Sequence, residues 1–191
     1  MKHLYIVIIM ILLSLPAFSQ WGIVGGVNIS KISDSRSVTF MTSGHIGGTY
    51  DFKLSKKWYF QPGVLFTSTG FNLKENLVLK GGHLRIYALE LPLNLSFRPL
   101  IVNDIEFLLN FGLYTRYGLF GNKKYDYQNL PSIKGDPFDA YNRFEAGLNL
   151  GFGLKKNQYS GLLVFQRGLS EAQKDLEDHH QVIKLSLGYN F

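Results

Sequence analysis

Long segments in which every second residue is apolar constrain the fold of this sequence more than any other feature. The clearest one ends the chain, where Ile183, Leu185, Leu187, Tyr189 and Phe191 alternate with polar or small residues. Because successive side chains of a β-strand point to opposite faces, a period of two predicts strands with one apolar and one polar face. No long stretch after the first twenty residues has the 3.6-residue period of an amphipathic helix. The chain is therefore predicted to be all-β.

Eight segments follow this pattern, four of them clearly and four more weakly. An even number of strands is what single-chain bacterial outer-membrane barrels have. Many of the segments exceed the ~9–11 residues that a tilted strand needs to cross hydrocarbon. We expect an eight-stranded antiparallel up-and-down transmembrane β-barrel, with strands at Trp21–Ile29, Phe40–Phe52, Trp58–Gly70, 87–98, 105–119, 143–154, Tyr159–Leu169 and Ile183–Phe191.

The links between these segments alternate in length. Three are short, at Leu54–Lys57, Pro99–Asp104 and Lys155–Gln158. Outer-membrane barrels have tight turns at the periplasmic end and longer loops outside, so the alternation favours such a barrel. The longer and more polar links are Ser30–Thr39, Asn72–Gly82, Asn122–Asp139 and Ser170–His180.

The start of the chain is predicted to be a cleaved signal peptide. Lys2 gives a positive beginning, an apolar run extends from Leu4 to Leu15, and small residues lead up to Ser19, where a signal peptidase would cleave. A transmembrane anchor is the alternative, but the run is shorter than the ~20 residues that span a bilayer, and Pro16 interrupts its end. We expect a signal peptide at residues 1–19 and an exported barrel domain at residues 20–191.

The composition argues against a disulfide-rich domain and against nucleic-acid binding. The sequence has no cysteine, so it has neither a disulfide framework nor a lipid-acceptor cysteine. Charged residues make up 18%, below the ~25% usual for soluble domains, while aromatic residues reach 15%. The net charge of +6 comes without a basic cluster, so anionic lipid head groups, including lipopolysaccharide, are the expected electrostatic partner.

Alternation alone does not say which face of the wall points outward. A soluble lipocalin-like barrel would keep its apolar face inside and bind a small apolar ligand in the periplasm. Here the other face is rich in glycine and carries few charges of both signs, which suits a narrow interior where opposite charges pair. We therefore expect lipid to contact the apolar face. The expected interior ion-pair residues are Glu90, Arg98, Glu106, Arg116, Arg143, Glu145 and Lys184.

Several motifs resemble one known family. The most specific is Leu89-Glu90-Leu91-Pro92-Leu93, and the others are Gly22–Ile29, Gln61–Phe66 followed by Gly70, Glu145–Gly153, Arg167–Leu169 and Leu185–Phe191. Over essentially the whole mature chain they resemble the outer-membrane β-barrel family that is common in Bacteroidetes and often labelled PorT-like. The resemblance implies the barrel fold and the cell outer membrane as its location, but neither an activity nor a role in secretion. The end of the chain, at Leu187, Tyr189 and Phe191, resembles the signal that the barrel assembly machinery reads.

Glu90 is the main candidate for a functional side chain, since Pro92 follows it on the same face of the strand. A buried catalytic acid is one interpretation, and an ion pair with Arg116 or Arg143 is the favoured one. Some small outer-membrane barrels are lipid-modifying enzymes that use a serine, a histidine and an acid, and Ser170 is expected near two of the histidines. No G-x-S-x-G turn marks a nucleophile. The histidines, His45, His83, His179 and His180, are therefore expected to be solvated loop residues.

No metal or cofactor site is expected. His179 and His180 would point to opposite faces of a strand, so as a pair they cannot chelate one ion. The segment Asn122–Asp139 combines lysines, tyrosines and aspartates, which suits either contact with lipopolysaccharide phosphates or a protein partner, or a solvated loop of mixed charge. The favoured function is a non-enzymatic outer-membrane barrel with a structural or interaction role through its loops. The alternatives are a lipid-modifying barrel enzyme and a soluble periplasmic ligand-binding barrel.

Overall fold

The structure is a computed structural model that describes residues 20–32, 38–75, 79–99, 101–102, 104–128, 131–170 and 179–191. The predicted signal peptide at residues 1–19 lies outside these ranges, and so do parts of the four expected long loops, at residues 33–37, 76–78, 129–130 and 171–178. No helix of the described residues is long and apolar enough to cross a bilayer.

The described residues form twelve strands and one short 3₁₀ helix, η1, and all twelve strands belong to one sheet. The long strands coincide with the alternating segments, because alternation gives a strand one apolar and one polar face. The elements are β1 Trp21–Ile32, β2 Val38–Thr39, β3 Met41–Tyr50, β4 Phe52–Lys53, β5 Trp58–Leu73, β6 Leu79–Phe97, β7 Ile101–Val102, β8 Ile105–Tyr127, β9 Ile133–Gly135, η1 Pro137–Asp139, β10 Phe144–Lys156, β11 Tyr159–Gly168 and β12 His180–Asn190.

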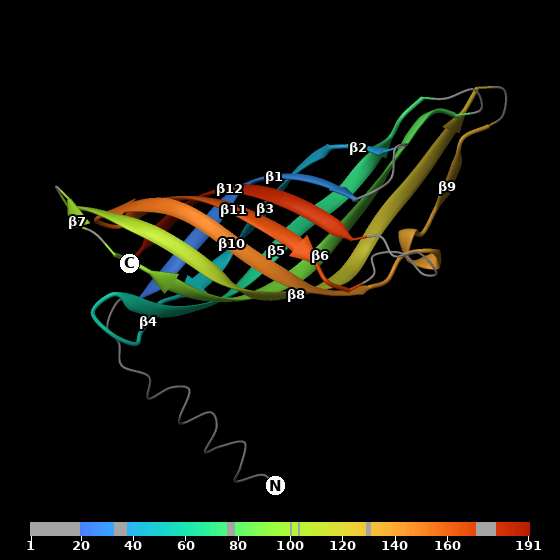
Figure 1. The fold of residues 1–191 in the computed structure, drawn as a ribbon. Coiled ribbons are helices and arrows are strands. Elements are labelled where there is room, and N and C mark those ends of the chain that lie inside the picture. The colour runs from blue at the N-terminus through green and yellow to red at the C-terminus, as the bar shows by residue number, and fades with distance from the viewer. Residues whose placement is uncertain are drawn as a thin grey trace, which may run out of the picture.

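The sheet closes on itself. Its antiparallel pairings run in the order β10-β11-β12-β1-β3-β5-β6-β8, and β8 pairs back to β10. Each long strand thus lies beside the long strands that precede and follow it in the sequence, and the last, β12, lies beside the first, β1. Figure 1 shows the long strands running side by side, with β5, β6, β8 and β9 reaching beyond the others at one end. Closure gives the backbone groups of both outermost strands a partner.

The count of twelve strands differs from the expected eight. β2, β4, β7 and β9 are only two or three residues long and pair beside a longer strand. One of these breaks divides the expected strand Phe40–Phe52 at Asp51, whose side chain is buried. The sequence pattern did not separate these short elements, because two or three residues carry no readable period.

Two expected loops are partly strand. β6 begins at Leu79 and β8 continues to Tyr127, so much of Asn72–Gly82 and the start of Asn122–Asp139 lie in the sheet. Glycines and charged residues made both segments resemble loops. The inward-facing Leu84 and Ile86 belong to a buried apolar cluster, which gives this part of the sheet its own core.

The ring has two different ends. The links at residues 54–57, 98–104 and 157–158 define what we call the short-turn end, where Asp104 and Asn157 have φ angles of 63° and 55°. Asp and Asn tolerate this left-handed region better than most residues. The opposite end, which carries the extension of β6 and β8, is called the long-loop end.

Burial distinguishes the two faces of the wall. Leu148 is 46% exposed, whereas Glu90 is 0% exposed. Along the middle of the wall the apolar side chains point outward and the polar ones point into the ring, as the face assignment from the sequence predicts. This is the reverse of a water-soluble barrel. The outward set includes Leu89, Leu91, Leu93, Phe111, Leu113, Phe152, Leu185 and Leu187.

Candidate functional site

The middle of the ring interior is polar, and Glu90 lies at its centre. Glu90 on β6 is opposite Arg116 on β8, and its Oε2 accepts hydrogen bonds from Arg116 Nε and Nη2 at 3.1 and 2.9 Å. Its Oε1 accepts from Lys184 Nζ at 2.6 Å and from Gln166 Nε2 at 2.9 Å. These contacts join β6 to β11 and β12, which are not its neighbours in the sheet. Glu90 is thus engaged as one partner of an ion-pair network.

Arg116 also binds a second carboxylate. Glu145 lies opposite Arg116 on β10 and accepts from its Nη1 at 3.2 Å. Tyr114 donates its hydroxyl to Glu145 at 2.5 Å, and His180 Nδ1 lies 2.6 Å from the other carboxylate oxygen. The two carboxylates are therefore balanced by the two cations Arg116 and Lys184. Such pairing, with further hydrogen bonds, is what makes the burial of charge tolerable.

Three amides extend this network, which we call the polar middle. Gln166 accepts from Arg116 Nη2 at 2.9 Å and donates to Asn149 Oδ1 at 2.8 Å. Asn149 in turn donates to Asn94 Oδ1 at 3.0 Å. The alternation puts Asn149 and Asn94 on the polar face of their strands, but none of the three amides was among the expected interior ion-pair residues. Asn149, for example, lies between the outward-facing Leu148 and Leu150, and this position predicts an inward-facing side chain.

His45 forms a separate interior chain of contacts. Its Nδ1 lies 2.7 Å from Asn28 Oδ1, and its Nε2 lies 2.9 Å from Ser186 Oγ. Asn28 Nδ2 donates to Thr67 Oγ1 and to the carbonyl oxygens of Gly44 and Ser68, all at 3.0 Å. Because these contacts fix the orientation of the Asn28 amide, Nδ1 of His45 carries the proton and Nε2 accepts from Ser186. The contacts of Asn28, His45 and Ser186 thus link β1, β3 and β12 across the interior.

The short-turn end holds a third polar group. Arg98 Nη2 binds Asp51 Oδ2 at 2.5 Å, and its guanidinium stacks 3.8 Å from the centre of the Tyr59 ring. Gln61 donates to Asp51 at 2.6 Å. Glu106 is more exposed and lies 3.9 Å from Arg98 Nη1. The sequence-predicted residues Arg98 and Glu106 therefore lie together, apart from the polar middle.

The long-loop end of the interior is apolar. We call the following cluster the apolar end: Ile32, Phe71, Leu84, Ile86, Ala88, Phe138 and Tyr141. Phe138 belongs to η1, which Pro137 begins and which Asp136 caps by accepting from the Phe138 N–H at 2.9 Å. The segment that carries Phe138 and Tyr141 folds back between β9 and β10 (Figure 1), so part of the expected solvated loop is buried.

The expectation that Arg143 lies in the interior is wrong. Its side chain is 43% exposed, and its Nη2 lies 3.9 Å from Asp136 Oδ2. Its guanidinium covers the Phe138 ring at 3.9 Å from the ring centre, and Nη1 donates to the carbonyl oxygen of Gly118 at 3.3 Å. Arg143 precedes β10, so it can bend over the apolar end and does not have to follow the strand's inward parity.

The expectation that all histidines are solvated loop residues is also wrong. His45 is 6% and His180 is 4% exposed, and both lie in strands with their side chains inside the ring. His179 Nδ1 lies 3.3 Å from the carbonyl oxygen of Ser170, while the Ser170 hydroxyl accepts from the Ala146 N–H at 2.9 Å. Ser170 and His179 therefore do not form a nucleophile and base.

The extension of β8 pairs most of its own charges. Lys123 binds Asp139 at 3.1 Å, and Lys124 Nζ lies 2.7 Å from Asp126. Hydrogen bonds from Lys124 and Ser132 hold the pKa of Asp126 below its usual range. This part of Asn122–Asp139 has the mixed charge of a solvated surface.

The described part of the interior contains one small cavity among its polar residues. A cavity of about 80 Å³ lies between the polar middle and the short-turn end, and Glu90, Lys184, His45 and Ser186 are among its lining residues. This volume has room for only a few water molecules. Within the described part of the chain, no three His, Cys, Asp or Glu side chains gather where they would hold a metal ion.

The last strand presents the predicted assembly residues on the outer face. Leu187 is 72% exposed, Tyr189 stacks edge-on with Tyr159 at 5.3 Å, and Phe191 is exposed at the strand end. The Phe191 N–H donates to the Trp21 carbonyl oxygen at 2.9 Å, so the end of β12 is closed against β1.

Comparison with known proteins gives the same type of fold. A family model described as outer membrane protein beta-barrel domain matches residues 14–171. No curated protein matches the sequence. Neisserial surface protein A is similar in structure, with a TM-score of 0.54 and 10% identity over 90% of this chain and 97% of its own.

Two further solved barrels match more distantly. Ail, the attachment invasion locus protein of Yersinia pestis, has a TM-score of 0.49 and 16% identity over 91% of this chain and 99% of its own. OprG from Pseudomonas aeruginosa has a TM-score of 0.46 and 15% identity over 91% of this chain and 96% of its own.

Proposed function

The chain belongs to the outer membrane protein beta-barrel domain family, and we propose that its eight long strands span the outer membrane as a closed barrel. In this proposal the short-turn end faces the periplasm and the long-loop end faces outward. The interior is filled by side chains and carries no wide pore. The protein acts without catalysis, through a structural or interaction role of its outer loops.

The observation that carries this proposal is the reversed burial of the wall. A ring with leucines and phenylalanines outside and ion pairs inside has no stable arrangement in water, because the outer apolar surface is continuous around it. In a bilayer the same surface is solvated by lipid tails, and the closed sheet satisfies every backbone group. The soluble ligand-binding barrel would need the opposite arrangement.

Two finer features belong to the same proposal. Residues 1–19 act as a signal peptide that is removed on export. The chain is a member of the PorT-like group, and the outward residues Leu187, Tyr189 and Phe191 bind the barrel assembly machinery. Replacing Phe191 with Asp should reduce the amount of folded barrel in the outer membrane, whereas Phe144→Asp, on an exposed residue at the other end of the wall, should reduce it less.

Cell fractionation tests the location directly. We expect the chain in the outer-membrane fraction, shortened at its N-terminus, and migrating faster on a detergent gel when it is not heated. Recovery in the soluble periplasmic fraction, with the same migration before and after heating, would refute the membrane barrel and favour the soluble one.

A further inference from the structure

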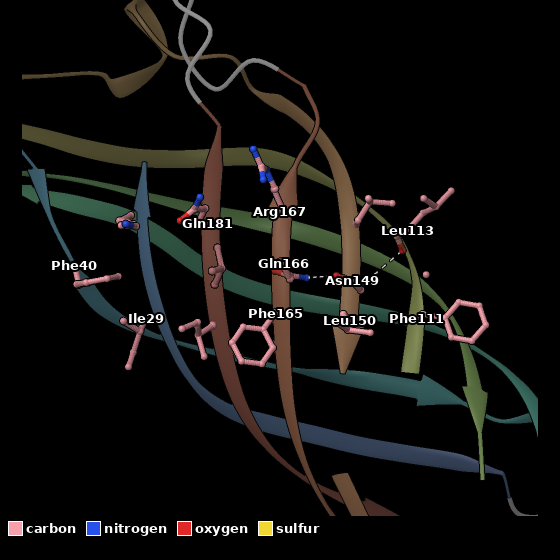
Figure 2. Close-up of a pocket in the computed structure, with 15 residues that line it drawn as sticks. Ile29, Phe40, Phe111, Leu113, Asn149, Leu150, Phe165, Gln166, Arg167 and Gln181 are labelled. Carbon is pink, nitrogen blue, oxygen red and sulfur yellow. Dashed lines mark hydrogen bonds between the residues drawn. The ribbon is translucent and has the colours of Figure 1, made fainter. Parts of the chain in front are cut away.

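A shallow hollow of about 830 Å³ crosses the outer face of the wall over β1, β12, β11, β10 and β8. Its broad floor is apolar, with Ile29, Phe165, Leu150 and Phe111 among the lining residues. Figure 2 shows Gln181 and Arg167 at one end of the hollow and Ile29, Phe165 and Leu150 below them. One end of the hollow therefore differs chemically from the rest.

Three polar side chains form that end side by side. Lys31 on β1 is paired with Gln181 on β12, and Gln181 is paired with Arg167 on β11. Each of the three is two residues away from an outward-facing apolar residue of its strand and therefore lies on the same outer face. These apolar residues are Ile29, Ile183 and Phe165. Strands in a sheet lie about 4.8 Å apart, so the backbones at Lys31 and Arg167 are about 10 Å apart. Two long cationic side chains at this separation can contact one phosphate group above Gln181.

Neither cation has a carboxylate partner within the described parts of the chain. The ion pairs found there involve other residues, and no Asp or Glu lines the hollow. The Nζ atom of Lys31 lies over the Phe40 ring, 5.2 Å from the ring centre. By contrast, Arg116 and Lys184 inside the ring are fully paired. As far as the described residues go, the rim of the hollow thus carries two positive charges without a paired carboxylate.

The rim also lies at the height of the outer head groups. Tyr159 and Tyr189 stack at the short-turn end of the outer face, where an aromatic girdle would mark the periplasmic interface. Arg167 is eight residues from Tyr159 along β11. At about 3.3 Å per residue and a tilt of about 40°, this places Arg167 about 20 Å above the girdle, close to the upper edge of an apolar band about 25 Å tall.

We propose that this hollow binds a phosphorylated lipid of the outer leaflet, with the phosphate held by Lys31, Gln181 and Arg167 and the acyl chains lying on the apolar floor. Charge and position both select this occupant: the anionic group meets the cations, and the tails meet leucine, isoleucine and phenylalanine side chains. The inference rests on the proposed function, because the hollow faces lipid only if the ring spans the outer membrane.

The test uses the full mature chain in detergent micelles, with monophosphoryl lipid A and its dephosphorylated form as probes and native mass spectrometry to count bound lipid. The wild type should bind the phosphorylated lipid at least about tenfold more tightly than the dephosphorylated one, as charge-assisted hydrogen bonds to two cations require. Lys31→Gln with Arg167→Gln should abolish this difference. Lys56→Gln with Lys57→Gln, which removes the same charge from the short-turn end, should preserve it.

Equal affinity of the wild type for both lipids would overturn the inference, and so would equal losses in the two double variants. Full displacement of the lipid by inorganic phosphate would show that the acyl chains contribute nothing and would also overturn it. Insertion into vesicles and heat-modifiable migration are measured on the same samples. A wild type that does not insert refutes the proposed function, whereas a chain that inserts but does not distinguish the lipids refutes only the lipid site.

Discussion

The polar middle and the apolar end fill the same ring by opposite means. The polar middle is assembled from strand residues alone, and its carboxylates Glu90 and Glu145 share the single guanidinium of Arg116. The apolar end needs residues from outside the long strands, because Phe138 and Tyr141 come from the segment between β9 and β10. One region closes the interior with directional contacts, and the other closes it with packing.

This difference predicts how each region responds to the substitution of one of its side chains. Hydrogen-bonded charges fit only one register of the strands, so the polar middle specifies which residues lie opposite each other. Apolar packing is not directional, so the apolar end can open locally while the ring remains closed. Losing one partner should therefore be costly in the polar middle and local at the apolar end. The following four changes test that contrast.

Arg116→Met should have the largest effect. It leaves Glu90 and Glu145 buried without their shared partner, which should lower the free energy of unfolding by about 3–5 kcal/mol. Urea unfolding of the chain refolded into lipid vesicles measures this. Combining Arg116→Met with Glu145→Gln should recover a large part of the loss, because Glu90 keeps its ion pair with Lys184. A loss below about 1 kcal/mol for the single variant would contradict a network that depends on Arg116.

Phe138→Ala should cost about 3 kcal/mol, because it removes the ring at the centre of the apolar end. The effect should be local: proteolysis between residues 131 and 143 should accelerate, while heat-modifiable migration remains. Phe144→Ala, on an exposed neighbour, is the matched control and should leave proteolysis unchanged. If Phe138→Ala unfolds the whole ring, the two regions are not separable.

Gly118→Ala should cost less, about 1–3 kcal/mol, through overpacking. A Cβ at Gly118 would lie 2.5 Å from the Phe138 ring, which has to move. Thermal unfolding and proteolysis of the single variant and of the Gly118→Ala and Phe138→Ala pair measure the coupling. Because the shortened side chain gives room for the new methyl group, the pair should lose less than the sum of the single losses. If the losses of the two single variants simply add in the double variant, the strain in Gly118→Ala does not come from contact with the Phe138 ring.

Asn28→Ala should have the smallest effect of the four on the ring, about 1–2 kcal/mol. It removes the contact to His45 Nδ1 and the three hydrogen bonds that Asn28 donates, but no charge. Urea unfolding under the same conditions as for Arg116→Met gives the comparison. A loss as large as that of Arg116→Met would mean that neutral hydrogen bonds, and not ion pairs, hold the interior together.

Much of the wall could be predicted from the sequence, and much less of the interior. The parity of β10 and β12 puts Leu148 and Leu187 outside and Glu145 and Lys184 inside, and this follows from a period of two. The contact of Lys184 with Glu90 could not be predicted, because it joins β12 to β6 across the ring. The burial of Phe138 and Tyr141 could not be predicted either. Two apolar residues in a segment of prolines, glycines and charged residues show no period.

The sequence by itself determined that the chain forms strands and which side of each strand is apolar, because alternation is a local property of neighbouring residues. Only the tertiary structure decided which interior groups meet, that Arg143 leaves the interior and covers Phe138, and that His45 contacts Ser186. Such contacts depend on the stagger and closure of the whole sheet, to which strands distant in the sequence contribute together.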